Sequence, residues 1–209
     1  SEPFKRREKA VFDVLGKRHV VPAQQGRAAE NVIMRAFLKP GDVVPMNYHF
    51  GSTANHIRIN GGKHIDLVAP DVAFTSASDN QFKGNIDIAR LEECIAQYGA
   101  EHIPFIRMEA STNLIGGQPF SMANLMEVRK VADRYGIKVL LDACLLGENA
   151  WLIIQREPEY ARATLSEVLL KMCSLADIVY FSARKLSCTR GAVIATDNYQ
   201  DKLKMDQVV

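Results

Sequence analysis

A lysine with an arginine beside it stands directly after a short apolar run near the end of this 209-residue chain. The run DIVYFS at residues 177–182 leads into Ala-Arg-Lys, which places Lys185 at the mouth of a buried segment. A neutral lysine amine in such a place condenses with an aldehyde to form a Schiff base. A surface loop with a common Arg-Lys pair is the competing interpretation, and this segment alone favours it.

Two further groups of residues follow apolar runs in the same way. Asp142 ends the run VLL, where its carboxylate caps the next segment or pairs with a cationic ring nitrogen. No histidine or second carboxylate follows it at ligand spacing, so no metal site is predicted. Gln25, Gly26 and Arg27 lie between an apolar run and a segment of helical period. A glycine at a helix start lets the backbone approach a phosphate, although a tight turn with an exposed arginine has the same pattern.

Two more residues are candidates for contacts with a ligand. Asn113 lies in a polar turn and either donates a hydrogen bond to a ligand oxygen or stabilises its own turn. Phe50 follows a predicted strand and either lies flat on a ligand ring or belongs to the core.

The elements that must position these residues alternate between short β-branched runs and longer segments of helical period. This alternation predicts an α/β fold in which a parallel sheet is covered by helices. Ligands gather outside the carboxyl ends of the strands in such a sheet, where the candidate residues stand. The predicted helices are 2–15, 26–38, 87–98, 121–135 and 157–176. The predicted strands are 19–22, 42–45, 64–67, 103–108, 138–142, 178–182 and 191–195.

The composition is that of a globular protein, with 47% hydrophobic residues and a formal net charge of +2. The charges are interspersed, so no nucleic-acid or membrane partner is expected. The four cysteines, at positions 94, 144, 173 and 188, lie far apart in no metal-type spacing. Reduced thiols in a cytoplasmic protein fit this pattern best, and no apolar stretch is long enough to cross a bilayer.

Several separated segments resemble the β-eliminating lyase family of pyridoxal-phosphate enzymes. The segments QQGRAAEN, FKGNID, TNLIGGQPFSMAN, DACLLGENAW and FSARK carry the resemblance, which extends over nearly all of the chain. It implies fold type I, the aspartate aminotransferase-like fold, with a mostly parallel seven-stranded sheet. It also implies a homodimer or homotetramer that eliminates the β-substituent of an amino acid and leaves pyruvate and ammonia.

The resemblance also implies a role for each candidate residue. Lys185 matches the lysine that forms the internal aldimine with pyridoxal 5'-phosphate, and Asp142 matches the partner of the pyridine nitrogen. Phe50 matches the aromatic side chain stacked on the cofactor ring, and Asn113 matches the residue near the phenolic oxygen. The residues that match the phosphate site are Gln25, Gly26, Arg27, Ser182 and Arg184.

The chain departs from the family pattern at positions near these residues. Leu145 stands where the family has an arginine close to the phenolic oxygen, and Ala28 and Ala54 replace a glycine and an arginine. Leu186 replaces an aspartate, and the turn that leads to Gly191 is shortened. These two changes argue against the monovalent-cation (K⁺) site that the family builds partly there.

Three functions therefore stay open. The favoured one is a pyridoxal-phosphate-dependent lyase that performs β-elimination on an aromatic or other β-substituted L-amino acid. The second is another pyridoxal-phosphate reaction on the same scaffold, such as transamination, β-replacement or decarboxylation, and the third is a non-catalytic relative. Residues 1–209 are expected to form the cofactor-binding large domain, with the small C-terminal domain of the family pattern absent.

Overall fold

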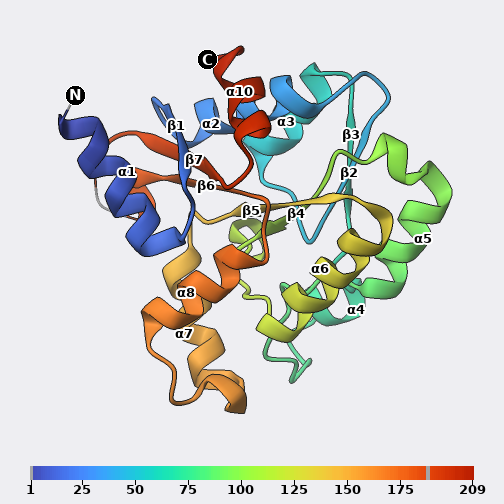
Figure 1. The fold of residues 1–209 in the computed structure, drawn as a ribbon. Coiled ribbons are helices and arrows are strands. Elements are labelled where there is room, and N and C mark those ends of the chain that lie inside the picture. Colours follow the sequence, from blue (N-terminus) through green and yellow to red (C-terminus); the bar gives the residue numbers. More distant parts are fainter. Residues whose placement is uncertain (1, 187–188) are drawn as a thin grey trace.

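The computed structural model describes residues 2–186 and 189–209, and these form a seven-stranded sheet with helices on both faces (Figure 1). The order across the sheet is β1-β7-β6-β5-β4-β2-β3. Strand β7 is antiparallel to β1 and β6, whereas the other neighbours pair in parallel. The prediction of a mostly parallel seven-stranded sheet is confirmed. The strands are β1 (His19–Ala23), β2 (Val43–Met46), β3 (Lys63–Asp66), β4 (Phe105–Glu109), β5 (Lys138–Asp142), β6 (Ile178–Ser182) and β7 (Ala192–Thr196).

The helices begin and end within the same described residues. The α-helices are α1 (Glu2–Leu15), α2 (Gly26–Phe37), α3 (Gly51–Ile59), α4 (Pro70–Ala73), α5 (Ile88–Tyr98), α6 (Met122–Tyr135), α7 (Leu146–Arg156), α8 (Leu165–Ser174), α9 (Ala183–Leu186) and α10 (Tyr199–Asp206). Three short 3₁₀ helices are η1 (Ala100–His102), η2 (Asn113–Ile115) and η3 (Pro158–Tyr160).

The two faces of the sheet carry separate hydrophobic cores. Helices α2, α3 and α10 cover one face, and α1, α5, α6, α7 and α8 cover the other (Figure 1). Alternation along the strands divides the residues between the cores. In β5, for example, Val139 and Leu141 face α6 and α8, whereas Leu140 faces α2 and α3. Because Asp142 follows this alternation, its side chain belongs to the α2 and α3 face.

The strand directions bring distant segments to one edge of the sheet. Strands β1, β4, β5 and β6 run in parallel, so their carboxyl ends share an edge, and the amino end of the antiparallel β7 joins them. Helices α2, α3 and α9 start close to that edge. Residues near positions 25, 50, 142 and 185 are therefore neighbours in space.

Several element predictions need correction. The predicted helix 157–176 is instead η3 followed by α8, because Thr164 starts a new helix with a capping box to Glu167. Helices α3, α7 and α10 and the four-residue helices α4 and α9 were not predicted. Strand β4 begins two residues later than predicted and extends to Glu109.

Two loops with sequences that match the family pack backbone against backbone. A Cβ atom on Gly84 would lie 2.3 Å from the carbonyl oxygen of Gln118, so only glycine fits there. The Gly84 N–H donates to the Pro119 carbonyl at 2.9 Å. The segments FKGNID and TNLIGGQPFSMAN thus support each other beneath the sheet edge.

The described cysteines are free thiols, and burial raises the pKa of Cys173 to about 12. This arrangement is consistent with the predicted reduced thiols at positions 94, 144 and 173. Cys188 lies outside the described residues, and so does part of the turn before Gly191. None of the helices described is long and apolar enough to cross a membrane.

Candidate active site

A cavity of about 510 Å³ opens at the carboxyl edge of the sheet, between the strand ends and the starts of α2, α3 and α9. Its volume is within the usual range for small-molecule sites. Eight of the nine predicted site residues line it: Gln25, Gly26, Arg27, Phe50, Asp142, Ser182, Arg184 and Lys185. The other lining residues are Glu30, Ser52, Glu109, Ala110, Cys144, Leu145 and Tyr180.

The rim of the cavity is the start of α2. Gly26 packs so closely on the end of β6 that an added Cβ atom would lie 3.0 Å from the Cβ of Ser182. The backbone N–H groups of Gly26 and Arg27 have no hydrogen-bond acceptor among the described residues. Free N–H groups at the positive end of a helix dipole bind phosphate. The rim therefore offers the kind of N–H donors that bind an anion.

Replacing Gly26 by alanine is expected to weaken this rim. The new methyl group must push α2 away from Ser182, which costs about 1–3 kcal/mol of unfolding free energy and weakens binding of a phosphorylated ligand. Urea denaturation and a fluorescence titration with pyridoxal phosphate measure the two effects. Gly51→Ala is the matched control, since Gly51 starts α3 with no atom within 4 Å of the added Cβ. Equal behaviour of the two variants would contradict the tight fit.

Three cations surround the opening. The side chains of Arg27, Arg184 and Lys185 are exposed and form no ion pair within the described chain. The Lys185 Nζ atom lies 5.1 Å from the centroid of the Phe50 ring, in a cation–π contact. Phe50 precedes α3 and is half-buried. The lysine amine and the aromatic ring thus face each other across the opening.

The floor of the cavity is a buried cluster around Asp142. Arg107 Nη2 donates to Asp142 Oδ2 at 2.6 Å, and the Tyr180 hydroxyl donates to the same oxygen at 2.7 Å. The Cys144 N–H donates to Asp142 Oδ1 at 3.0 Å. Arg107 is fully buried and donates also to Glu109 Oε2 at 3.0 Å. The Asp142 carboxylate is therefore fixed in orientation before any ligand binds.

The charges of this floor do not balance. The Arg107 guanidinium faces the carboxyl groups of Glu30, Glu109 and Asp142. Burial alone would lower the pKa of Arg107, but Tyr180 and these carboxyl groups raise it well above its ordinary value. Burial raises the pKa of Glu109 against the opposing pull of Arg107. An excess of carboxyl groups over cations in a buried place favours a further positive charge, such as a protonated ring nitrogen.

Sequence reasoning missed the residues that support Asp142. Arg107 and Glu109 alternate with Met108 in a strand that is buried throughout, and Tyr180 lies in the next strand but one. Charged residues at alternating positions of an apolar strand share one face. This spacing was the signal in the sequence from which Arg107 and Glu109 could have been found. Glu30 accepts hydrogen bonds from Ser52 and Thr53, at 2.6 Å each, and so joins α2 to α3.

Asn113 is the one predicted site residue that does not line the cavity. Its side chain is exposed, and its backbone N–H donates to Glu109 Oε1 at 3.0 Å. The turn before it is strained, because Ser111 has a left-handed φ of 51°. Asn113 in this structure thus contributes to the cavity through Glu109.

Two other positions bear on the chemistry of the cavity. Leu145 lines it with an apolar side chain beside Cys144, at the position where the family resemblance has an arginine. Burial and the Asp142 carboxylate raise the pKa of the Cys144 thiol far above its ordinary value, so it is not a nucleophile at neutral pH.

The sequence model of the Beta-eliminating lyase family matches residues 1–203. The chain belongs to this family. Its segments for the phosphate rim, the Asp142 strand and the Lys185 turn all lie inside the matched region. The predicted family resemblance is confirmed.

Curated relatives of this family member include several enzymes named tyrosine phenol-lyase. The enzyme of Symbiobacterium sp. (strain SC-1) is 43% identical over 182 residues, which is 87% of this chain and 40% of the relative. The enzyme of Nostoc punctiforme is 38% identical over 200 residues, which is 95% of this chain and 43% of the relative. The chain thus spans about two fifths of the length of the curated relatives that it matches.

A solved structure supports the fold. NtdA from Bacillus subtilis, crystallised with bound cofactor PMP, superposes with a TM-score of 0.62 at 25% identity. The superposition covers 97% of this chain and 39% of NtdA. The predicted fold type I architecture of this family member is confirmed.

Proposed function

We propose that the cavity binds pyridoxal 5'-phosphate, the cofactor of the beta-eliminating lyase family, and that the protein is a lyase acting on an L-amino acid. One observation carries the proposal. An exposed lysine amine faces an aromatic ring near a buried aspartate, and the start of α2 lies at the same cavity with Arg27 and Arg184, which form no ion pair among the described residues. These are the groups that an aldehyde, a pyridine ring and a phosphate require.

The residues present fit the cofactor. The Gly26 rim, with Arg27, Ser182 and Arg184, would hold the phosphate through N–H groups, a hydroxyl and two guanidinium groups. Lys185 would hold the aldehyde carbon, and Phe50 would pack on the ring. The volume of about 510 Å³ leaves room for an amino acid beside the cofactor.

Asp142 retains the capacity to accept one more hydrogen bond. A carboxylate has about four lone-pair sites, and three are used by Arg107, Tyr180 and the Cys144 N–H. The Cys144 thiol is a weak donor to the same carboxylate, and a ring N–H would take the remaining place in preference to it. Because the surrounding carboxyl groups favour positive charge, the aspartate would keep the ring nitrogen protonated.

The chain's own residues then carry the proton transfers. When bound, the cofactor supplies an electron sink for the charge that develops at the substrate α-carbon. The Lys185 amine stands where it can remove the α-proton and later return a proton. The apolar Leu145 and the buried floor exclude water from this side of the cavity.

We propose β-elimination from an aromatic or other β-substituted L-amino acid as the reaction. The relatives named tyrosine phenol-lyase support it, and the Leu145 side chain supports an apolar substituent near the ring. Residues 1–209 would act as the cofactor-binding large domain, and we expect a cytoplasmic homodimer or homotetramer.

Leu145 also favours a second candidate, another pyridoxal-phosphate reaction on the same scaffold. A leucine offers no charged donor to the cofactor's phenolic oxygen, and this donor is one control on which bond breaks. Transamination, β-replacement and decarboxylation are the alternatives.

The two candidates differ in their products. The full-length protein, given pyridoxal phosphate and a panel of amino acids, is expected to release pyruvate and ammonia in equal amounts. Coupled assays for both products and for keto-acid exchange measure this. Keto-acid exchange, CO2 release or a new β-substituted amino acid without ammonia release would establish the second candidate. Absence of every product with cofactor bound would establish a non-catalytic relative.

A further inference from the structure

Two histidines and an aspartate meet at the β2 and β3 side of the sheet, outside the cavity. His64 and Asp66 lie on β3 at positions i and i+2, so their side chains share one face of the strand. His49 comes from the segment between β2 and α3. None of these residues lines the proposed cofactor cavity.

The side chains already lie at distances close to those of a metal site. One ligand atom from each residue can be chosen so that all three lie within 4.8 Å of one another. His49 Nδ1 is 2.7 Å from Asp66 Oδ2, and the centroids of the His49 and His64 rings are 4.9 Å apart. Ligands about 2.1 Å from a tetrahedral ion are roughly 3.4 Å apart, so small side-chain rotations complete the site.

One oxygen of this cluster lacks a partner. Asp66 Oδ1 is buried and accepts no hydrogen bond within the described chain. A buried carboxylate oxygen without a partner costs free energy, and such an exception in a native protein calls for a water or an ion. The other carboxylate oxygen, Oδ2, is hydrogen-bonded to His49 Nδ1, so only Oδ1 of Asp66 lacks a partner among the described residues.

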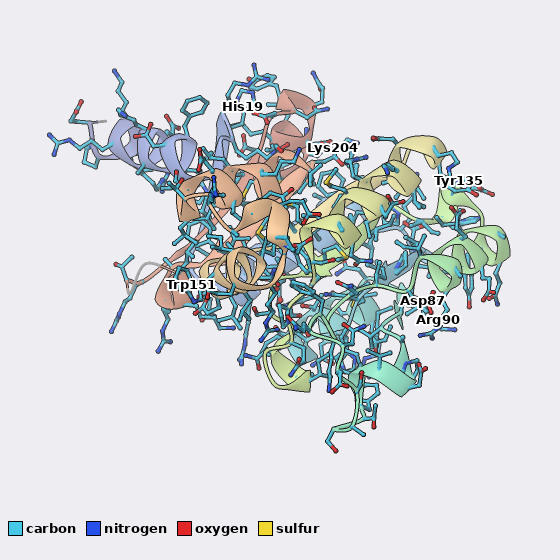
Figure 2. The ribbon with its side chains drawn as sticks, turned by 90° about the horizontal axis from the view of Figure 1, so that it is seen from below. His19, Asp87, Arg90, Tyr135, Trp151 and Lys204 are labelled. Carbon is cyan, nitrogen blue, oxygen red and sulfur yellow. The ribbon has the colours of Figure 1, made fainter. Side chains whose placement is uncertain are left out.

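The backbone holds the cluster in place. Arg90 donates to the carbonyl oxygens of Asp66 at 3.2 Å and Val68 at 2.6 Å. Figure 2 labels Arg90 beside Asp87, the residue that caps α5. The pairing of Val44 with His64 and of Met46 with Asp66 fixes β3 on the sheet. Two of the three proposed ligands, His64 and Asp66, therefore stand on a regular strand, as a specific metal site favours.

The donor set indicates the kind of ion. Two imidazoles and one carboxylate suit Zn²⁺ and its neighbours in the first transition row, whereas Ca²⁺ and Mg²⁺ prefer oxygen ligands. Asp66 supplies a carboxylate oxygen 2.7 Å from His49 Nδ1, so a negative charge is present for the ion. The side chains of His49 and Asp66 are 29% and 26% exposed, so an ion can enter.

We propose that His49, His64 and Asp66 bind a divalent transition-metal ion, Zn²⁺ in the first instance. Three protein ligands leave a fourth position for water, as in open zinc sites. The ion satisfies the orphan Asp66 oxygen and ties β3 to the segment that leads into Phe50. This proposal is independent of the cofactor chemistry.

Isothermal titration of the full-length protein with Zn²⁺, with and without pyridoxal phosphate, tests the proposal. One equivalent is expected to bind, and His64→Gln or Asp66→Asn is expected to weaken binding more than about 10-fold. His102→Gln is the matched control, because His102 lies 3.9 Å from Asp42 without a third ligand. Unchanged affinity in the first two variants, or no binding by the wild type, would overturn the site.

A second measurement needs no variant. Co²⁺ bound to the wild-type protein is expected to show visible bands of a nitrogen and oxygen site without thiolate charge transfer. A charge-transfer band would assign the ion to a cysteine and overturn the proposal. The result stands even where a variant fails to fold.

Discussion

Lys185→Ala is expected to abolish covalent attachment of pyridoxal phosphate and to reduce turnover by more than about 1,000-fold. The structure gives the reason, because Lys185 supplies the exposed amine that faces Phe50 at the cavity. Without it, neither the aldehyde partner nor the group that removes the α-proton remains. The absorbance band near the visible edge, its fixation by borohydride and peptide mapping of the fixed label measure the first effect.

The matched control is Lys171→Ala, an exposed lysine on α8 far from the cavity. It is expected to keep the band, the label and the turnover of the wild type. A Lys185→Ala protein with the same reducible band would refute the assignment of Lys185. Non-covalent cofactor binding should persist in that variant, because Gly26, Arg27 and Asp142 are intact.

Arg107→Leu is expected to lower the unfolding free energy by about 3–5 kcal/mol at neutral pH. Arg107 is fully buried, and it pairs with Asp142 and Glu109 at 2.6 and 3.0 Å. Leucine removes the cation and leaves two carboxyl groups facing each other in a buried place. Urea denaturation measures the loss, and Arg6→Leu, an exposed arginine beside Glu2, should change stability little.

The loss should depend on pH in a defined direction. Without Arg107, the pKa of the Glu109 carboxyl rises further above its unfolded value of 4.5, because the opposing charge is gone. A carboxyl group with a raised folded pKa destabilises the protein as pH rises from that unfolded value through the folded one. The variant should therefore recover part of the lost stability as pH falls toward 4.5. A pH-independent loss would attribute the effect to packing alone.

Much of the site could be predicted from the sequence, because the ends of the strands can be recognised in it. Asp142 and Lys185 follow apolar runs, and parallel strands bring their carboxyl ends to one edge. The spacing of Arg107 and Glu109 indicates only that they share one face of their strand. The contact of Arg107 with Asp142 and Tyr180 could not be predicted, because it depends on strand order and register. The grouping of His49, His64 and Asp66 was not predicted for the same reason, since His49 is 15 residues before His64 and the β2 and β3 pairing helps to bring them together.

The missed helices and the reversed strand have different causes. Helix α7 begins after Leu145, which provides no side-chain cap, whereas Asn198 caps α10 and was an available signal. The antiparallel direction of β7 could also have been predicted from the sequence. Only residues 183–191 separate β6 from β7, and a parallel connection needs a dozen or more.

The contact between the start of α2 and the end of β6 has a consequence for the order of folding. Tyr180 and Glu30, which meet in the cavity floor, are 150 positions apart in the chain. Such long-range contacts form late, because the entropy of closing the loop must be overcome first. The β1 and α2 segment leaves the ribosome long before β6 is synthesised. The growing chain therefore lacks a complete cofactor-binding cavity until then. Cofactor capture thus marks the completion of the sheet rather than its nucleation.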